Sequence, residues 1–235
     1  IELGKAAALE ELHRLCKERN IDPLLHLPKL DASLNLSPSS KALQQETRYD
    51  PTEQQQLYES LFSLIKDNPE QLAAWSAVLA ALNGAEANVI YVDGPAGAGK
   101  TTLYNCLLAY LRSVGKIGLP HAFSGIAAQQ LSGGKTIHSR FRLPVPLPLD
   151  DASCGLPLNS DVAKLIKAAS LLIWDEGPNA PKAAFDAINF FLQQLMQSDR
   201  PFGGKVILIG GDFRQIPPVL RRIDSSAVRQ YSLHA

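Results

Sequence analysis

Apolar positions along this chain follow two different periods. Runs in which apolar residues lie three or four apart, the spacing of one helical face, occur at residues 68–84, 103–115, 163–168 and 182–196. Short continuous apolar runs, typical of buried strands, occur at residues 89–93, 170–176 and 205–209. Strands that alternate with helices in this way predict an α/β fold, with a mostly parallel sheet and helices on both faces.

The first helix of this series has clear end signals. Asn68 is a favourable N-cap, Pro69 fits the first turn, and Asn83-Gly84 closes the helix. Gln71, at the third helical position, fits the reciprocal half of a capping box. The side chains expected to face inward are Leu72, Trp75, Val78, Leu79 and Leu82 in this helix, Leu103, Leu107, Tyr110, Leu111 and Val114 in the next, and Phe185, Ile188, Leu192 and Leu195 in the last.

The first 67 residues show no strand pattern. Helical spacing occurs between Glu2 and Arg19 and again between Leu57 and Ile65, with a proline-containing stretch between them. We therefore expect a small helical segment over residues 1–67, followed by the α/β domain over residues 68–235. The chain begins at Ile1 and ends without a closing element after Ala235, which favours a fragment.

A glycine-rich turn follows the apolar run at residues 89–93. Its form, G-x-x-x-x-G-K-[ST], is that of a phosphate-binding loop. Lys100 is expected to reach the β- and γ-phosphates, and the Thr101 hydroxyl to bind Mg²⁺. An ordinary strand-to-helix turn is the alternative, but the flanking strand and helix are the context that the motif requires. The expected ATP-binding residues are Gly94, Pro95, Ala96, Gly97, Ala98, Gly99, Lys100, Thr101 and Thr102.

Two acidic residues end the strand predicted at residues 170–176. Parallel sheets bind ligands at the carboxyl ends of their strands, so Asp175 and Glu176 should face the phosphate loop. Asp175 is then placed to hold Mg²⁺ through water, and Glu176 to orient or deprotonate the attacking water. The alternative is that these acids serve as a helix N-cap.

The strand predicted at residues 205–209 delivers Asp212, Arg214 and Gln215 to the same edge of the sheet. Such an element suits a protein that must sense the γ-phosphate. Between these strands the pattern is less regular. His121–Ser124 is expected to form a short strand, and the prolines at positions 144, 146 and 148 favour an extended surface loop that is either a docking site or a stiff connector.

Composition narrows the class of protein. The 235 residues include 23 basic and 23 acidic side chains, so no global basic field attracts the chain to nucleic acid or membranes, although a groove can be locally basic. Cys16, Cys106 and Cys154 lack the spacing of a zinc site or a disulfide framework, and no apolar stretch has membrane length. We expect a reducing, intracellular compartment and no membrane association.

Four blocks occur in the order GPAGAGKTT, SGIAAQQLSGGKTIHS, LLIWDEGPNAPKAAFDAI and PFGGKVILIGGDFRQIPPV. Together they resemble the petite-integration-frequency family of superfamily-one DNA helicases, in particular its branch in Helitron rolling-circle transposons. The resemblance implies a RecA-like P-loop NTPase lobe, Mg²⁺ as cofactor, single-stranded DNA as partner, and ATP-dependent DNA unwinding with 5′ to 3′ polarity. It also favours a nuclear or other intracellular location.

The resemblance adds roles for individual residues. Gln71 is similar to the glutamine that reads the adenine edge, and Gln215 to the residue that contacts the γ-phosphate and couples hydrolysis to DNA. Ser124, Gly125, Thr136 and His138 lie in blocks that hold the single-stranded DNA backbone. For His138, a packed histidine without a ligand is the alternative.

The family's motor has two RecA-like lobes, and only the first is recognisable in this chain. We therefore expect a second lobe from the full-length protein, and nucleotide binding with feeble hydrolysis from this chain alone. Two other classes stay open. A P-loop phosphotransferase would phosphorylate a small acceptor, and a non-catalytic transposon remnant would keep the fold without turnover. The intact Lys100, Asp175, Glu176 and Gln215 speak against the remnant.

Overall fold

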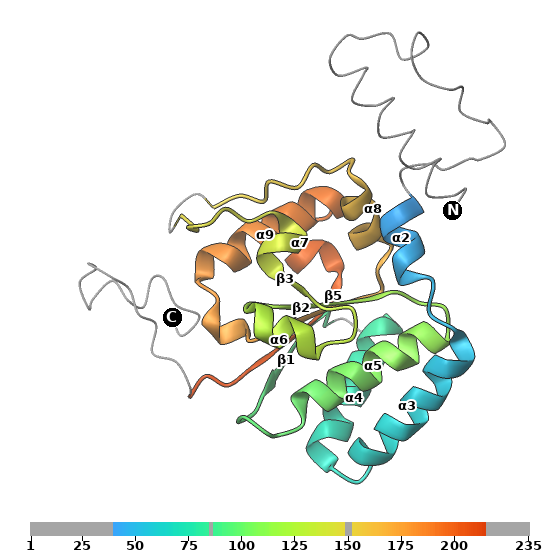
Figure 1. The fold of residues 1–235 in the computed structure, drawn as a ribbon. Coiled ribbons are helices and arrows are strands. Elements are labelled where there is room, and N and C mark those ends of the chain that lie inside the picture. The colour runs from blue at the N-terminus through green and yellow to red at the C-terminus, as the bar shows by residue number, and fades with distance from the viewer. Residues whose placement is uncertain (1–39, 85–86, 149–151, 215–235) are drawn as a thin grey trace, which may run out of the picture. The chain divides into compact units, whose positions relative to one another are not determined.

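A computed structural model describes residues 40–84, 87–148 and 152–214 (Figure 1). The helix expected at Glu2–Arg19 and the γ-phosphate residue Gln215 lie outside these ranges. The helices are α2 (Ser40–Glu46), α3 (Pro51–Ile65), α4 (Pro69–Leu82), α5 (Lys100–Ser113), α6 (Gly125–Gln130), α7 (Ile137–Phe141), α8 (Asp161–Ala168) and α9 (Lys182–Met196), with 3-10 turns η2 (Gly177–Asn179) and η3 (Pro201–Gly204). No helix in the described part of the chain has the length and apolar character needed to cross a bilayer.

The strands form one five-stranded sheet in which every pair is parallel. They are β1 (Val89–Asp93), β2 (Gly118–Ala122), β3 (Lys135–Thr136), β4 (Leu171–Asp175) and β5 (Val206–Gly211), in the order β1-β5-β4-β2-β3. The predicted α/β fold is confirmed. Because all strands run the same way, the ends of β1, β4 and β5 bring the phosphate loop and the acidic residues to one edge of the sheet.

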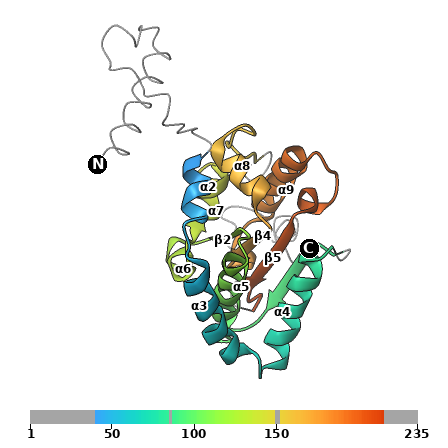
Figure 2. The same cartoon turned by 90° about the vertical axis from the view of Figure 1, so that its right-hand side faces the viewer.

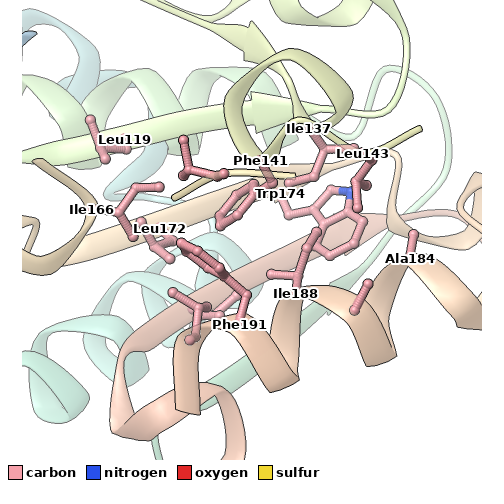
Figure 3. Close-up of a cluster of buried hydrophobic side chains, with 14 of the residues drawn as sticks. Leu119, Ile137, Phe141, Leu143, Ile166, Leu172, Trp174, Ala184, Ile188 and Phe191 are labelled. Carbon is pink, nitrogen blue, oxygen red and sulfur yellow. The ribbon is translucent and has the colours of Figure 1, made fainter. Parts of the chain in front are cut away.

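Helices cover both faces of this sheet (Figures 1 and 2). Side chains of β4 alternate between the two faces, so Leu171 and Ile173 pack with α5, whereas Leu172 and Trp174 pack with α8 and α9. Trp174 lies among apolar side chains from α7 and α9 (Figure 3) and stacks on Phe185 with ring centroids 4.0 Å apart. Burial on both faces explains why β4 and β5 are continuous apolar runs, whereas β1, expected as the same kind of strand, leaves Val89 and Tyr91 exposed.

Helix α4 begins as expected but buries a narrower face. The Asn68 side chain accepts hydrogen bonds from the N–H groups of Glu70 and Gln71, and Pro69 occupies the first helical position. Trp75 and Val78 are buried, whereas Leu72 is 37 % exposed, so its predicted inward position is wrong. The residues that face β1 near this end of the helix are small, namely Ala73, Ala74 and Ala77, and they line a cavity.

Two further positions differ from expectation for identifiable reasons. Val114 follows the last residue of α5 and is half exposed, because the chain turns away at the helix end. The strand expected at His121–Ser124 is β2, and it begins earlier, at Gly118. Pro120 is tolerated there because, among the described strands, it lies beside β4 alone; β3 pairs with His121 and Ala122. Ser124 leaves the strand to cap α6.

Helix α3 packs along α5 and α4 through aromatic side chains. Tyr58 stacks on Trp75 at 5.6 Å between ring centroids, and Phe62 and Tyr110 complete the cluster. The described residues between Ala42 and Arg214 form one compact unit with the sheet. The boundary at residue 67 between a helical segment and the α/β domain stays a prediction.

Candidate functional site

The phosphate loop joins β1 to α5 at the carboxyl edge of the sheet. Gly97 and Gly99 both have φ of +80°, a left-handed conformation that side chains disfavour. The loop begins against the sheet, because Gly94 N–H donates to the Gly211 carbonyl of β5 at 3.0 Å. Lys100 is the first residue of α5, and its Nζ donates to the carbonyls of Gly94 (2.6 Å) and Pro95 (3.0 Å). The lysine is thus held over the loop.

Gln71 lies against this loop. Its Nε2 donates to the Ala98 carbonyl at 2.8 Å and does not return to Asn68, whose N–H donates to Ile65. The Gln71 half of the predicted capping box is therefore wrong, because the glutamine side chain binds the loop and not its own helix end, while Asn68 still caps the Gln71 N–H. A Cβ atom on Gly99 would overlap Gln71 Nε2, so the glycine also makes room for this contact. The adenine contact of Gln71 stays a prediction.

Asp175 and Glu176 face the phosphate loop across a cavity of about 650 Å³. This cavity is hereafter called the acidic cavity. Its lining includes Gly97, Gly99, Lys100, Thr101, Thr102, Ser124, Asn179, Asp175, Glu176 and Asp212. The parallel sheet produces this arrangement directly, since β4 ends at Asp175 and β5 ends just before Asp212. The chain thus places a lysine, a threonine hydroxyl and three carboxylates around one space.

Hydrogen bonds fix both members of the acid pair. Asp175 Oδ1 accepts from the Glu176 N–H at 2.9 Å, and Glu176 Oε2 accepts from the backbone N–H of Ser124 at 3.0 Å. Glu176 itself has φ of +57°, an uncommon backbone conformation for this residue type. Burial raises the pKa of Asp175, as does the neighbouring Glu176 carboxylate, while the Glu176 N–H and Lys100 oppose the shift. Glu176 occupies the N-cap position of the short turn η2, but its side chain makes no capping hydrogen bond there and binds the Ser124 N–H instead.

The donors in the acidic cavity fit a divalent hard cation. Mg²⁺ prefers oxygen ligands and keeps several waters, with one or two carboxylates and substrate phosphates completing its shell. The Thr101 hydroxyl and the Asp175 carboxylate are oxygen donors on opposite sides of the same cavity, so they are the residues that could hold the ion. Mg²⁺ itself stays a prediction.

A second cavity, of about 670 Å³, lies between α4 and β1 on the other side of the phosphate loop. Gln71, Ala74, Tyr91, Lys100 and Arg214 contribute to its lining. Arg214 Nε donates to Asp212 Oδ1 at 2.8 Å, which ties the end of β5 to this cavity. Of the three polar residues predicted beyond this strand, Asp212 therefore faces the acidic cavity, Arg214 the second cavity, and Gln215 lies outside the described residues.

The four residues expected to contact DNA lie in the α6–α7 segment, residues 124–141. Ser124 and Thr136 are the N-caps of α6 and α7, and Gly125 is the first residue of α6. The Phe123 and His138 rings lie 5.2 Å apart, and partial burial lowers the pKa of His138. Because β2 and β3 pair at Ala122 and Thr136, the two caps are brought to one edge of the sheet. Contact of His138 with DNA therefore stays a prediction, beside the alternative of a packed histidine without a ligand.

Comparison with known proteins settles the family. The model of the PIF1-like helicase family matches residues 66–234. This chain belongs to the PIF1-like helicase family. The resemblance to the petite-integration-frequency family is therefore confirmed, whereas the Helitron branch stays a prediction.

Individual relatives agree with this assignment. The ATP-dependent DNA helicase Pif1 of Psychrobacter is 31% identical over 138 residues, which are 58% of this chain and 21% of that protein. Bacteroides Pif1 bound to single-stranded DNA superposes with a TM-score of 0.55 at 29% identity, covering 69% of this chain and 35% of that one. Bacteroides Pif1 with ADP-AlF4 gives 0.54 at 29% identity, covering 70% and 37%. The chain thus spans about a fifth to just over a third of these relatives.

Sequence reasoning missed three features of this PIF1-like lobe. The backbone N–H of Ser124 holds Glu176, Asn179 lines the acidic cavity, and the hydroxyl of Tyr104 is buried against Gly210 of β5. The first two depend on contacts between distant segments and leave no local signal. Tyr104 did leave one, because it follows Lys100 by four residues and Thr101 by three and so shares their side of α5.

Proposed function

We propose that this chain is the nucleotide-binding lobe of an ATP-dependent DNA helicase, which hydrolyses ATP while it moves along single-stranded DNA. The observation that carries the proposal is the acidic cavity, where Lys100 and Thr101 of the phosphate loop face Asp175 and Glu176. Family membership supports the same reading, since the Psychrobacter relative is an ATP-dependent DNA helicase. Work on DNA would place the protein in the nucleus or another reducing compartment.

In the proposed reaction, the phosphate loop binds the triphosphate. Lys100 would exchange its bonds to the Gly94 and Pro95 carbonyls for bonds to the β- and γ-phosphates. Thr101 and Asp175 would hold Mg²⁺, which neutralises charge on the phosphates when bound. Glu176 would accept a proton from the attacking water, Gln71 would contact adenine from its place on the loop, and Gln215 would contact the γ-phosphate.

The α6–α7 segment is the proposed strand-binding surface. Ser124, Gly125, Thr136 and His138 would contact the sugar-phosphate backbone, so little sequence preference is expected. The polarity of movement, 5′ to 3′, is carried over from the family resemblance. A second RecA-like lobe would close over both the nucleotide and the strand.

The hydrogen bond between Glu176 Oε2 and the Ser124 N–H offers a route between the two sites. Its acceptor is the residue proposed to activate water, and its donor belongs to the segment proposed to contact DNA. A DNA strand that displaces Ser124 when it binds would therefore also move the Glu176 carboxylate. This supports hydrolysis that responds to DNA, a property that a small-molecule phosphotransferase does not need.

The proposal is tested by steady-state ATP hydrolysis with Mg²⁺, with and without single-stranded DNA. The measurement is made on this chain and on a version extended through the second lobe, each beside a Glu176→Gln variant. We expect DNA to stimulate the extended protein, and the substitution to abolish turnover in both. An extended protein that binds ATP but ignores DNA would overturn the helicase proposal. A phosphorylated small acceptor would then favour a phosphotransferase, and absence of any turnover a remnant.

A further inference from the structure

One buried hydroxyl near the acidic residue Asp175 lacks a well-formed hydrogen bond among the described residues. Tyr104 lies in the second turn of α5, and its side chain is fully buried. Its Oη has no hydrogen-bond partner of good geometry among the described residues, although the Asp175 carboxylate lies close enough to affect its pKa. Buried hydroxyls in native proteins are almost always hydrogen-bonded. A phenylalanine would fill the same space without an unpaired donor, so the presence of the hydroxyl needs an explanation.

The sheet leaves room for this hydroxyl at Gly210. A Cβ atom on Gly210 would overlap Tyr104 Oη and would lie 2.7 Å from Tyr104 Cζ. Gly210 is near the carboxyl end of β5, and the neighbouring strand β4 ends at Asp175. The glycine thus allows the phenol to reach the edge of the sheet where the acidic cavity opens.

Asp175 is the acidic neighbour of the hydroxyl. Burial is the main cause that raises the pKa of the Tyr104 phenol, and the Asp175 carboxylate is the next. Conversely, the Tyr104 hydroxyl is one of the groups that oppose the burial-driven rise in the pKa of Asp175. Asp175 Oδ1 already accepts from the Glu176 N–H. A second hydrogen bond, donated by the Tyr104 hydroxyl, would hold the Asp175 carboxylate in a single orientation.

We propose that Tyr104 is a positioning residue for Asp175: its hydroxyl donates to the Asp175 carboxylate in the Mg²⁺-nucleotide complex and so keeps this carboxylate directed at the ion. The inference rests on the proposed function, because it concerns the ion that accompanies the nucleotide. Partners of metal-ligating carboxylates stabilise metal binding by fixing ligand orientation in advance. Tyr104 would do so from the buried interior, without touching the nucleotide.

The test compares nucleotide affinity with and without the metal. ADP is titrated into the wild-type chain, Tyr104→Phe and Tyr110→Phe, in Mg²⁺ and in EDTA, and the ratio of the two affinities is the gain due to Mg²⁺. Tyr110 is a matched control, because it lies on the same helix within the aromatic cluster of α3 and α4. We expect Tyr104→Phe to reduce the gain by about tenfold, the effect of losing one hydrogen bond to a charged group.

Two further measurements separate positioning from structure. The affinity in EDTA and the melting temperature of Tyr104→Phe should equal those of the wild type, since the substitution removes no packing. In an Asp175→Ala background, Tyr104→Phe should have no additional effect on the gain. A full Mg²⁺ gain in Tyr104→Phe, or equal losses in Mg²⁺ and EDTA, would overturn the inference alone. A wild-type chain that binds no ADP would overturn the proposed function and this inference with it.

Discussion

The phosphate loop and the α6–α7 segment meet at the same edge of the sheet, but they are held there in different ways. The loop takes its shape mainly from its own residues, through left-handed glycines and bonds such as Lys100 to Gly94, and distant segments add two bonds, from Gln71 and to Gly211. The α6–α7 segment is held from a distance by polar side chains of α2 and α5. Local geometry can be recognised in a sequence because its residues are neighbours, whereas a distant scaffold cannot.

The scaffold of the α6–α7 segment centres on two buried arginines. Arg112 of α5 donates to Ser132 Oγ and to the Ser132 carbonyl, both at 2.8 Å, and its guanidinium lies 3.8 Å from the centre of the Tyr49 ring. Arg140 of α7 donates from Nε to His121 at 3.3 Å. Glu46 of α2 lies 3.8 Å from both guanidinium groups. One acid thus offsets two buried cations that come from separate elements.

The largest expected effect comes from removing this acid. Glu46→Ala would leave Arg112 and Arg140 buried without a counter-charge, a change that costs about 3–5 kcal/mol when a buried ion pair loses one member. Urea unfolding should show this loss in the free energy of unfolding. Glu59→Ala, which removes an exposed acid from α3, should cost less than about 0.5 kcal/mol. Equal stability of the two variants would show that the scaffold does not depend on Glu46.

The next largest effect is expected on ADP affinity when the phosphate loop loses its lysine. Lys100→Ala should weaken ADP binding by about 100-fold or more, because charge-assisted hydrogen bonds to phosphate are lost. The free energy of unfolding should change little, since the hydrogen bonds of Lys100 to the described residues go to two loop carbonyls. Isothermal titration gives the affinity, and Lys116→Ala, an exposed residue just beyond the C-terminal end of α5, is the control. Unchanged affinity in Lys100→Ala would refute the phosphate-loop assignment.

Lowering the pH should destabilise the scaffold of the α6–α7 segment, because this scaffold contains a buried neutral histidine. His121 Nδ1 donates to the Ile173 carbonyl at 3.1 Å and Nε2 accepts from Arg140, so the ring is neutral. Burial, and then Arg140, hold the pKa of His121 well below 6.5. The unfolded chain therefore binds a proton that the folded chain excludes. The stability contributed by neutral His121 is complete above pH 6.5 and is lost as the pH falls below it.

The expected size of this effect is about 1.4 kcal/mol per pH unit below 6.5 for one proton. Urea unfolding at pH 7.0 and pH 5.5 measures it. A His121→Asn variant should lose most of this pH dependence, whereas His138→Asn, at the less buried ring, should keep it. A wild-type chain equally stable at both pH values would contradict the neutral, buried state of His121.

The smallest effects should come from single helix caps. Asn68→Ala removes the cap of α4. Ser160→Ala removes the cap of α8, where the Ser160 hydroxyl accepts from the Ala163 N–H. Each should lower the free energy of unfolding by about 1 kcal/mol. Asn68→Ala should also weaken ADP binding slightly, because Gln71 in the same turn contacts the loop. Thermal unfolding with and without ADP checks both, and identical ADP-induced shifts in the two variants would exclude the link through Gln71.

These differences explain which parts of the molecule could be predicted. The phosphate loop, the acid pair and helix α9 follow from spacing within single segments, and the structure places them as expected. The predicted start of strand β2 was too late, since a proline such as Pro120 is unfavourable in the middle of a sheet. It is accommodated here because β3 is short and pairs with His121 and Ala122. Helices α6 and α7, with six and five residues, are too short for a periodic signal, and their scaffold comes from other elements.

The hydrogen bond between Glu176 and the Ser124 N–H is where the locally fixed and the distantly held regions join. We propose that this bond makes hydrolysis respond to DNA. Ser124→Ala and Ser124→Pro both remove the side-chain cap of α6, but only proline removes the N–H. Their melting temperatures are compared first, to ensure that both fold.

The decisive measurement is the ratio of ATP hydrolysis rates with saturating single-stranded DNA and without DNA, in the version extended through the second lobe. We predict that Ser124→Ala retains the wild-type ratio and that the ratio for Ser124→Pro falls toward one. Equal stimulation of the two variants by DNA would contradict the account.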